Sequence, residues 1–175
     1  MNIYKNFLTK DEFKNIKTEM MGEWFPWFFQ NEVLVRDDKH FQFTYTFLNK
    51  KGMNCPPETM NIISPILKKI KYKKLNKVKA NLLTRTNKIT EQGMHIDQPQ
   101  GTTGIFYINN CNGYTKFKTG EKIKSEENKY VEFNSTVEHT GSSCTNQNRR
   151  IVINFNYVWI YLITTGILNQ QYLQK

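Results

Sequence analysis

Two histidines and one aspartate in the second half of the chain have the residue types and spacing of a metal site. His95 and Asp97 are two residues apart in a segment, Met94–Asp97, that has strand character, and alternate side chains of a strand project from the same face. His139 follows at the end of a later strand candidate. Two imidazoles and one carboxylate suit a non-haem iron(II) ion bound on one face of its octahedron. We therefore expect His95, Asp97 and His139 to be Fe(II) ligands that leave three coordination positions open.

A pair of arginines opens the last predicted strand and offers a second functional group. A guanidinium binds a carboxylate through two parallel hydrogen bonds, but strand alternation lets only one of Arg149 and Arg150 face the metal ligands. The residues that would share a face with Arg150 are Val152, Asn154 and Asn156, and those on the opposite face are Ile151, Ile153 and Phe155. The apolar row belongs in a core. We therefore expect Arg150 to lie in the site with Asn154 and Asn156, and Arg149 to face solvent.

The segments around these residues are predicted to form two helices followed by short strands. Thr9-x-x-Glu12 is a capping box that predicts a helix at about 10–22, and an isoleucine-rich stripe predicts a second at about 57–70. Period-two alternation and turn-forming clusters predict strands at 41–47, 78–83, 94–97, 104–109, 129–133 and 151–157. This pattern is typical of a mainly β fold, a sandwich or barrel with supporting α-helices packed on one sheet.

The length and patterning of the chain predict a single domain. The 175 residues show no linker or repeat, so we expect one unit, 1–175, with a helical N-terminal support of about 1–75 and a β core of about 76–160. The final segment, 158–175, fits either a strand or a short helix. The N-terminus has no export signal and no apolar run reaches the ~20 residues of a spanning helix, which predicts a cytoplasmic protein without a membrane partner.

The positive charge of the chain is concentrated in one segment. The formal net charge is +10, and Lys68–Lys79 contains no acidic residue. Such a basic patch would attract a nucleic acid, an acidic protein or a small polyanion. The alternative is a solvated helix end and the loop after it, because lysines are favoured near the C-terminal end of a helix.

The ordered set of H-x-D, a distal histidine and an arginine at the start of the next strand resembles the 2-oxoglutarate/Fe(II) dioxygenase superfamily. Over about 78–157 the chain is most similar to the prolyl 4-hydroxylase-like branch, including its short viral and bacterial members. The resemblance implies a double-stranded β-helix, or jelly roll. It also implies a hydroxylase that oxidises an unactivated C–H bond while 2-oxoglutarate is converted to succinate and CO2, with Fe(II) as cofactor, O2 as oxidant and ascorbate as a reductant.

The same resemblance assigns roles to further residues. Arg150 matches the arginine that anchors the distal carboxylate of 2-oxoglutarate, and Tyr107, in Phe106-Tyr107-Ile108-Asn109, matches the tyrosine that assists it. Asn81 lies on the strand before H-x-D, where family members contact the co-substrate or the substrate. A structural role for this asparagine fits equally well.

The sequence leaves the substrate open among several classes. The branch favours a prolyl or other residue of a protein or peptide, bound at a site rimmed by aromatic residues such as Trp24 and Trp27. A nucleic-acid base would suit the positive charge, but repair demethylases of the superfamily carry a second arginine six residues beyond the anchor, where this chain has Asn156. A small-molecule substrate and a non-catalytic jelly-roll binding module are the remaining alternatives.

Overall fold

The computed structural model describes residues 1–33 and 40–159 of the chain, which are mainly β-strand, as the sequence predicts. The elements in chain order are β1 (Asn2–Tyr4), α1 (Lys10–Met21), β2 (Phe28–Gln30), β3 (Gln42–Asn49), β4 (Gly52–Met53), α2 (Pro57–Ile62), α3 (Ser64–Lys69), β5 (Lys74–Thr84), β6 (Thr102–Tyr107), β7 (Tyr114–Phe117), β8 (Lys122–Lys124), β9 (Lys129–Asn134), β10 (His139–Gly141) and β11 (Arg149–Val158).

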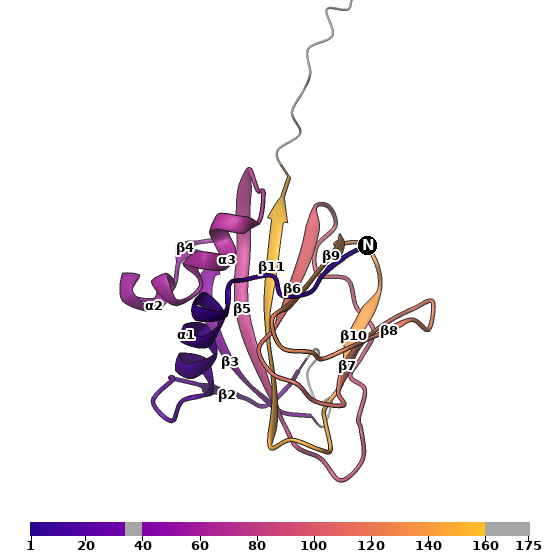
Figure 1. Ribbon diagram of the computed structural model, residues 1–175. Helices are drawn as coiled ribbons and strands as arrows, with labels where there is room; N and C mark the ends of the chain where they lie inside the picture. Colours follow the sequence, from indigo (N-terminus) through magenta and orange to yellow (C-terminus); the bar gives the residue numbers. More distant parts are fainter. Residues whose placement is uncertain (34–39, 160–175) are drawn as a thin grey trace, which may run out of the picture.

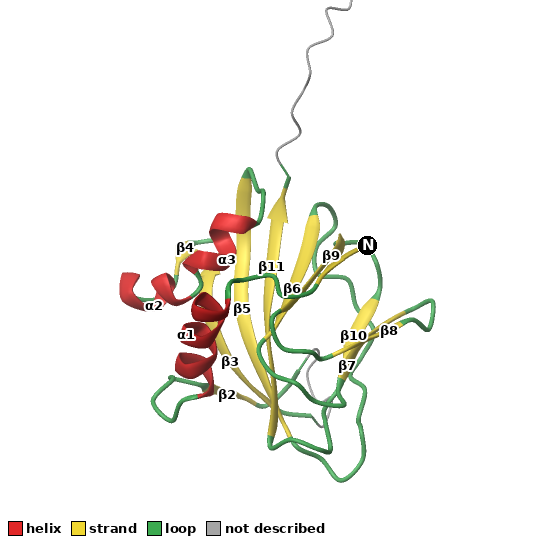
Figure 2. Ribbon diagram, viewed as in Figure 1, coloured by secondary structure: helices red, strands yellow, loops and turns green. Residues whose placement is uncertain are grey.

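The strands form two antiparallel sheets. The larger sheet has the order β1-β9-β6-β11-β5-β3-β2, with β4 paired to β3, and the smaller has the order β10-β7-β8. Figure 1 shows the helices on one side of the larger sheet and the smaller sheet on the other, and Figure 2 shows the loops that join the two sheets. From β6 to β11 the chain passes repeatedly between the sheets. This arrangement is the predicted jelly roll.

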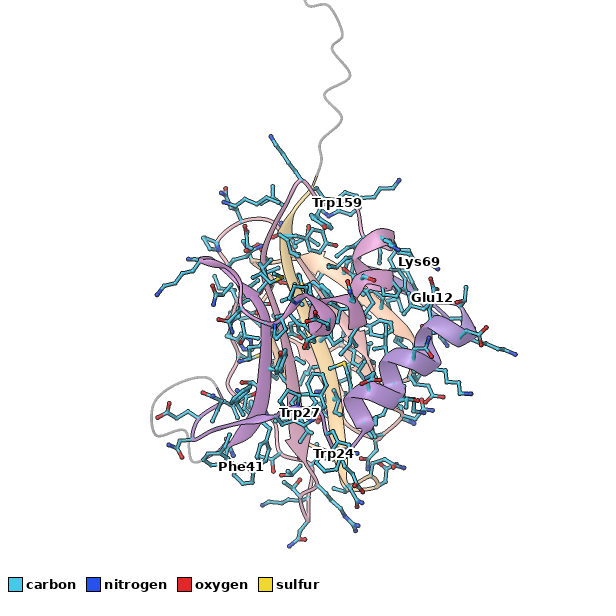
Figure 3. The ribbon with its side chains drawn as sticks, turned by 90° about the vertical axis from the view of Figure 1, so that its left-hand side faces the viewer. Glu12, Trp24, Trp27, Phe41, Lys69 and Trp159 are labelled. Atoms are coloured by element: carbon cyan, nitrogen blue, oxygen red, sulfur yellow. The ribbon has the colours of Figure 1, made fainter. Side chains whose placement is uncertain are left out.

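The first core lies between the helices and the larger sheet (Figure 3). The buried side of α1 carries Phe13, Ile16 and Met20, which belong to one hydrophobic cluster with Ile153 of β11. The predicted capping box is present at the start of α1: Glu12 accepts a hydrogen bond from the Thr9 backbone, and the Thr9 hydroxyl accepts one from the Glu12 backbone. The amphipathic pattern and its cap therefore place α1 where the sequence predicts.

The second predicted helix is divided in two. The structure has α2 and α3 separated at Ile63, instead of one continuous helix over 57–70. Pro65 has no N–H and cannot donate the hydrogen bond that would continue the helix to the carbonyl four residues earlier. Ile63 and Ile66 are nevertheless fully buried in the first core, so the apolar stripe still packs against the larger sheet.

The second core lies between the two sheets, and β11 contributes to both cores. Val152 of β11 clusters with Ile105, Tyr107, Phe117, Ile123, Val131 and Phe133. The residues of β11 that join the helix-side core are Ile151, Ile153, Phe155 and Tyr157. The two faces predicted for this strand are therefore confirmed, and Arg150 lies on the face that meets the smaller sheet.

Two predicted segments are not regular elements of the described structure. Met94–Asp97 is not a regular strand, because within it only His95 forms a bridge, to His139. Most of 158–175 lies outside the described residues, so the alternative of strand or helix is not decided there. Within the described part of the chain, no helix has the length and apolar character needed to cross a membrane.

Candidate metal centre

The structure brings together the three residues that the sequence predicts as metal ligands. One ligand atom from each of His95, Asp97 and His139 can be chosen so that all three lie within 4.8 Å of one another. The Nε2 atom of His95 is 3.9 Å from Oδ1 of Asp97, and Nε2 of His139 is 3.6 Å from Oδ2. The side chain of His139 is only 3% exposed, whereas that of His95 is 28% exposed. One ion could therefore bind between the three groups, with the site open on the His95 side.

A local backbone pairing holds the two histidines side by side. The N–H of His95 donates to the carbonyl of His139, and the N–H of His139 donates back to the carbonyl of His95, each at 3.0 Å. This is the reciprocal pair of an antiparallel ladder, in which the two Cα atoms lie about 5.5 Å apart. The N–H of Asp97 donates to the carbonyl of Ser135 at 3.2 Å. The short β10 strand thus positions the two histidines, and the turn after β9 positions Asp97.

Hydrogen bonds to the backbone orient both imidazole rings. Nδ1 of His95 is 3.1 Å from the carbonyl oxygen of Gly93, and Nδ1 of His139 is 3.0 Å from that of Val137. A ring that donates from Nδ1 keeps the lone pair on Nε2, the atom that points toward Asp97. Burial lowers the pKa of His139, which favours the neutral ring that a metal requires.

The carboxylate of Asp97 is held by a chain of polar side chains. Thr103 of β6 donates its hydroxyl hydrogen to Oδ2 at 2.7 Å, and Nδ2 of Asn156 donates to the Thr103 hydroxyl at 3.2 Å. Thr103 is opposite Asn156 in the pairing of β6 with β11. Asn156, predicted as a site-lining residue, therefore reaches Asp97 through Thr103. Such outer contacts fix a ligand in place and tune its basicity.

Glu91 links the segment before H-x-D to β7 of the smaller sheet through hydrogen bonds. Its carboxylate accepts hydrogen bonds from Tyr114 at 2.6 Å and from Lys116 at 2.7 Å, and Lys122 lies 3.6 Å away. Lys116, and then Tyr114, hold the pKa of Glu91 at about 2, below the ordinary value of 4.5. The carboxylate thus stabilises the folded chain in its ionised form.

Replacement of Glu91 by glutamine should change the acid stability of the protein. Because the folded-state pKa lies below the ordinary value, the stabilisation is complete above pH 4.5 and is lost as the pH falls toward 2. We expect Glu91→Gln to lower the unfolding free energy at pH 7 by about 1 kcal/mol at most, and to flatten its fall below pH 4.5. Urea unfolding across this pH range measures both effects. Glu138→Gln, which removes an exposed ion pair with Lys118, is the control, and parallel curves for wild type and Glu91→Gln would contradict the prediction.

A buried guanidinium lies in the same cavity as the three ligands. Arg150 is 2% exposed, and its Nη2 donates to the hydroxyl oxygen of Thr115 at 3.3 Å. Its Nε has no acceptor in the described part of the chain. Burial lowers the pKa of Arg150, since the charge has lost water without gaining a carboxylate partner. A buried, incompletely paired guanidinium is a group that an anionic ligand would complete.

Thr115 and Tyr107 add hydroxyl groups beside Arg150. The Tyr107 hydroxyl donates to the Thr115 hydroxyl at 2.9 Å, and the Arg150 guanidinium lies 5.7 Å from the Tyr107 ring centre. Burial raises the pKa of Tyr107, so its hydroxyl stays protonated. Thr115 accepts from both residues, which leaves its own hydrogen available to a ligand oxygen. Gly113 makes room for the side chain of Arg150, because a Cβ at position 113 would lie 2.7 Å from Cδ of Arg150.

One cavity of about 350 Å³ contains the metal cluster and Arg150. The predicted residues Asn81, Asn154 and Asn156 also line it. Tyr107 does not line the cavity and contacts it through Thr115. Trp24 and Trp27 are not among the lining residues: Trp24 is 94% exposed, and Trp27 packs against the helix-side core, on the side of the sheet seen in Figure 3.

Arg149 lies on the opposite face of β11 from Arg150, as predicted, but it does not simply face solvent. It is half-buried, and its guanidinium donates a hydrogen bond to the carbonyl of Met21 at the end of α1. It lines a separate pocket together with Trp27. The reason is that α1 ends above this face of the sheet, which the strand pattern alone does not reveal.

Several cavity residues are not among the predicted site residues, and two of them are lysines of the basic segment Lys68–Lys79. Lys77 and Lys79 of β5 line the cavity with Thr115 and Gln92. Burial, and then the charge of nearby Lys77, lower the pKa of Lys79 to about 8. The lysines alternate with buried Val78 and Ala80, so the period-two pattern could have revealed their common face.

The fold and the cavity define a double-stranded β-helix with a His-Asp-His cluster and a buried arginine between its two sheets. No family model matches the sequence, and no curated protein matches it. Among solved structures, the fold is similar to that of a Trichoplax adhaerens prolyl hydroxylase in complex with a hypoxia inducible factor peptide fragment, at 15% identity and a TM-score of 0.64, over 90% of this chain and 82% of that one.

Two further solved structures support the same fold. A Pseudomonas putida prolyl-4-hydroxylase matches at 12% identity and a TM-score of 0.58, over 90% of this chain and 91% of that one. The non-heme alpha-ketoglutarate-dependent carbocyclase SnoK, from nogalamycin biosynthesis, matches at 9% identity and a TM-score of 0.65, over 90% of this chain and 78% of that one. At these identities the likeness establishes the fold, and the function must be argued from the site.

Proposed function

We propose that this chain is an Fe(II)- and 2-oxoglutarate-dependent dioxygenase that hydroxylates an unactivated C–H bond of a protein or peptide. The observation that carries the proposal is the shared cavity: three groups able to bind one metal ion and an incompletely paired, buried guanidinium open into the same space. A metal site with open positions and a separate carboxylate anchor are the two parts that such an enzyme requires.

The residues of the cavity divide into two functions. His95, Asp97 and His139 would hold Fe(II), whose chemistry, when it is bound, is the activation of O2 for hydroxylation coupled to decarboxylation of 2-oxoglutarate. Arg150 would bind the distal carboxylate of 2-oxoglutarate through its guanidinium, with the Thr115 hydroxyl as a second donor. Tyr107 holds Thr115 in place. The balanced reaction is substrate C–H, 2-oxoglutarate and O2 giving substrate C–OH, succinate and CO2.

A protein or peptide substrate is the class that the comparisons favour. Two of the similar structures are prolyl hydroxylases, and one of them holds a peptide fragment. The cavity is open at the His95 side, and several carboxamide side chains line it: Gln42, Asn81, Gln92, Asn154 and Asn156. Carboxamides both donate and accept hydrogen bonds, as recognition of a peptide backbone requires.

The test of the proposed function is succinate formation from 2-oxoglutarate by the purified full chain. With Fe(II), O2 and ascorbate, we expect slow succinate production without any substrate, which stops when a chelator is added or when Zn(II) replaces iron, because zinc has no redox chemistry. Mass spectrometry of succinate provides the measurement. A protein that binds Fe(II) and 2-oxoglutarate yet forms no succinate, alone or with prolyl peptides, would overturn the proposal and favour a non-catalytic binding module.

A further inference from the structure

The cavity has a second cationic end that the proposed reaction does not use. Lys77 and Lys79 line it from β5, opposite Asn156 and Asn154 of β11. Arg150 is opposite Leu83 in the same pairing. At about 3.3 Å per residue, Lys79 is about 13 Å and Lys77 about 20 Å along the sheet from the arginine. A five-carbon dicarboxylate bound at Arg150 would not reach both lysines.

The lysine pair lies close to the metal cluster. Lys77 is opposite Asn156, and Asn156 is opposite Thr103, whose hydroxyl binds Asp97. Two strand spacings therefore separate the backbone of Lys77 from that of Thr103, about 10 Å. An anionic group bound by the lysines would therefore belong to the substrate, and another part of the same substrate molecule would reach the metal.

Neither ammonium forms a hydrogen bond or an ion pair with a described residue, although the charge of Asp97 attracts Lys79. Lys79 is half-buried, and Lys77 is exposed at the cavity mouth. Of the described residues that line the cavity, three are cationic, Lys77, Lys79 and Arg150, against one carboxylate, Asp97, so the formal excess is two positive charges. The charges of Fe(II) and of the 2-oxoglutarate dianion would cancel, so binding of both would leave this excess of positive charge unchanged. An anionic substrate would neutralise it.

The other lining groups favour a peptide over a nucleic-acid base. Apart from the two histidines of the metal cluster, no aromatic side chain is among the described residues of the lining, so this part of the cavity lacks the stacking surface on which single-stranded bases are commonly held. Oδ1 of Asn154, which is buried and next to Lys79 across the strands, has no donor in the described part of the chain. A peptide N–H would supply that donor.

We propose that the substrate is an acidic peptide segment, in which an Asp or Glu carboxylate binds between Lys77 and Lys79 while a neighbouring residue lies at the metal. The inference rests on the proposed function and names the substrate class of the same site. Lysine lacks the two-pronged geometry of arginine, so the pair selects charge rather than a fixed orientation of the carboxylate.

The experiment is an affinity selection with the full-length, metal-free protein and a peptide library randomised around a central proline. We expect retained peptides to be enriched in Asp or Glu within three residues of the proline. For the best sequence, the wild type should bind the Glu peptide at least tenfold more tightly than its Gln counterpart by fluorescence anisotropy. The double variant Lys77→Gln/Lys79→Gln should reduce this ratio to about two, and high salt should reduce it as well.

Lys74→Gln is the matched control, because Lys74 is exposed on the same strand and is not among the lining residues. It should keep the full preference. Selection without acidic enrichment, retention of no peptide, or an equal preference in the double variant would overturn the proposal. Binding of a short oligonucleotide that depends on Lys77 and Lys79 would also overturn it, in favour of a nucleic acid. Because selection needs no turnover, acidic enrichment without succinate formation would contradict the proposed function alone, and succinate formation without enrichment would contradict this inference alone.

Discussion

Substitution of any one of His95, Asp97 and His139 by alanine should abolish iron-dependent succinate formation and weaken Fe(II) binding by more than about 100-fold. The three groups converge within 4.8 Å, and removal of one leaves two ligands for an ion that needs three protein ligands to stay bound with open positions. Changes to groups that only orient a ligand already cost about 10–100-fold in metal affinity, so loss of a ligand itself should cost more.

The measurement is metal titration by calorimetry with Fe(II) under anaerobic conditions, alongside succinate formation. His40→Ala is the matched control, because His40 is the remaining histidine of the chain and is not among the cavity-lining residues. Thr103→Val should give an intermediate loss, since it removes the hydrogen bond to Asp97 and keeps all three ligands. Circular dichroism shows whether each variant is folded. Wild-type iron affinity in a folded Asp97→Ala protein would contradict the assignment of the site.

The sequence predicts the faces of the strands better than the way in which distant segments meet. Strand alternation is a local property, so the inward face of β11 and the apolar face toward the helices follow from the order of the residues alone. The capping box of α1 is equally local. Pro65 also indicates the break between α2 and α3 in the sequence, but the apolar stripe continues across the break and therefore favours a single helix.

The arrangement around H-x-D depends on contacts that no local pattern contains. His95 lies beside His139 because the two residues exchange backbone hydrogen bonds, although 94–97 forms no regular strand. Thr115 becomes a neighbour of Arg150 only when the smaller sheet closes over the larger one. The same is true of Trp27, which the fold places in the helix-side core and not at the cavity. Long-range sheet contacts therefore decide which residues complete the candidate site.

Arg150→Ala should weaken the apparent affinity for 2-oxoglutarate by at least tenfold. The arginine is buried and lines the cavity, and no salt bridge joins its guanidinium to a carboxylate of the described residues. Truncation of one partner of a buried, hydrogen-bonded charge pair costs about 2–5 kcal/mol, and about 1.4 kcal/mol is tenfold in affinity. Tyr107→Phe should give a smaller loss, because the tyrosine acts on the carboxylate through Thr115.

Arg149→Ala is the matched control for this prediction, since it removes the adjacent guanidinium from the same strand. Arg149 lies on the opposite face and donates to the carbonyl of Met21, so its loss should lower the free energy of unfolding without changing the response to 2-oxoglutarate. The dependence of succinate formation on 2-oxoglutarate concentration, together with urea unfolding, separates the two effects. If Arg149→Ala impaired 2-oxoglutarate binding and Arg150→Ala did not, the co-substrate would have to bind on the helix-bearing side of β11, away from the metal cluster. The shared cavity would then no longer support the proposed reaction.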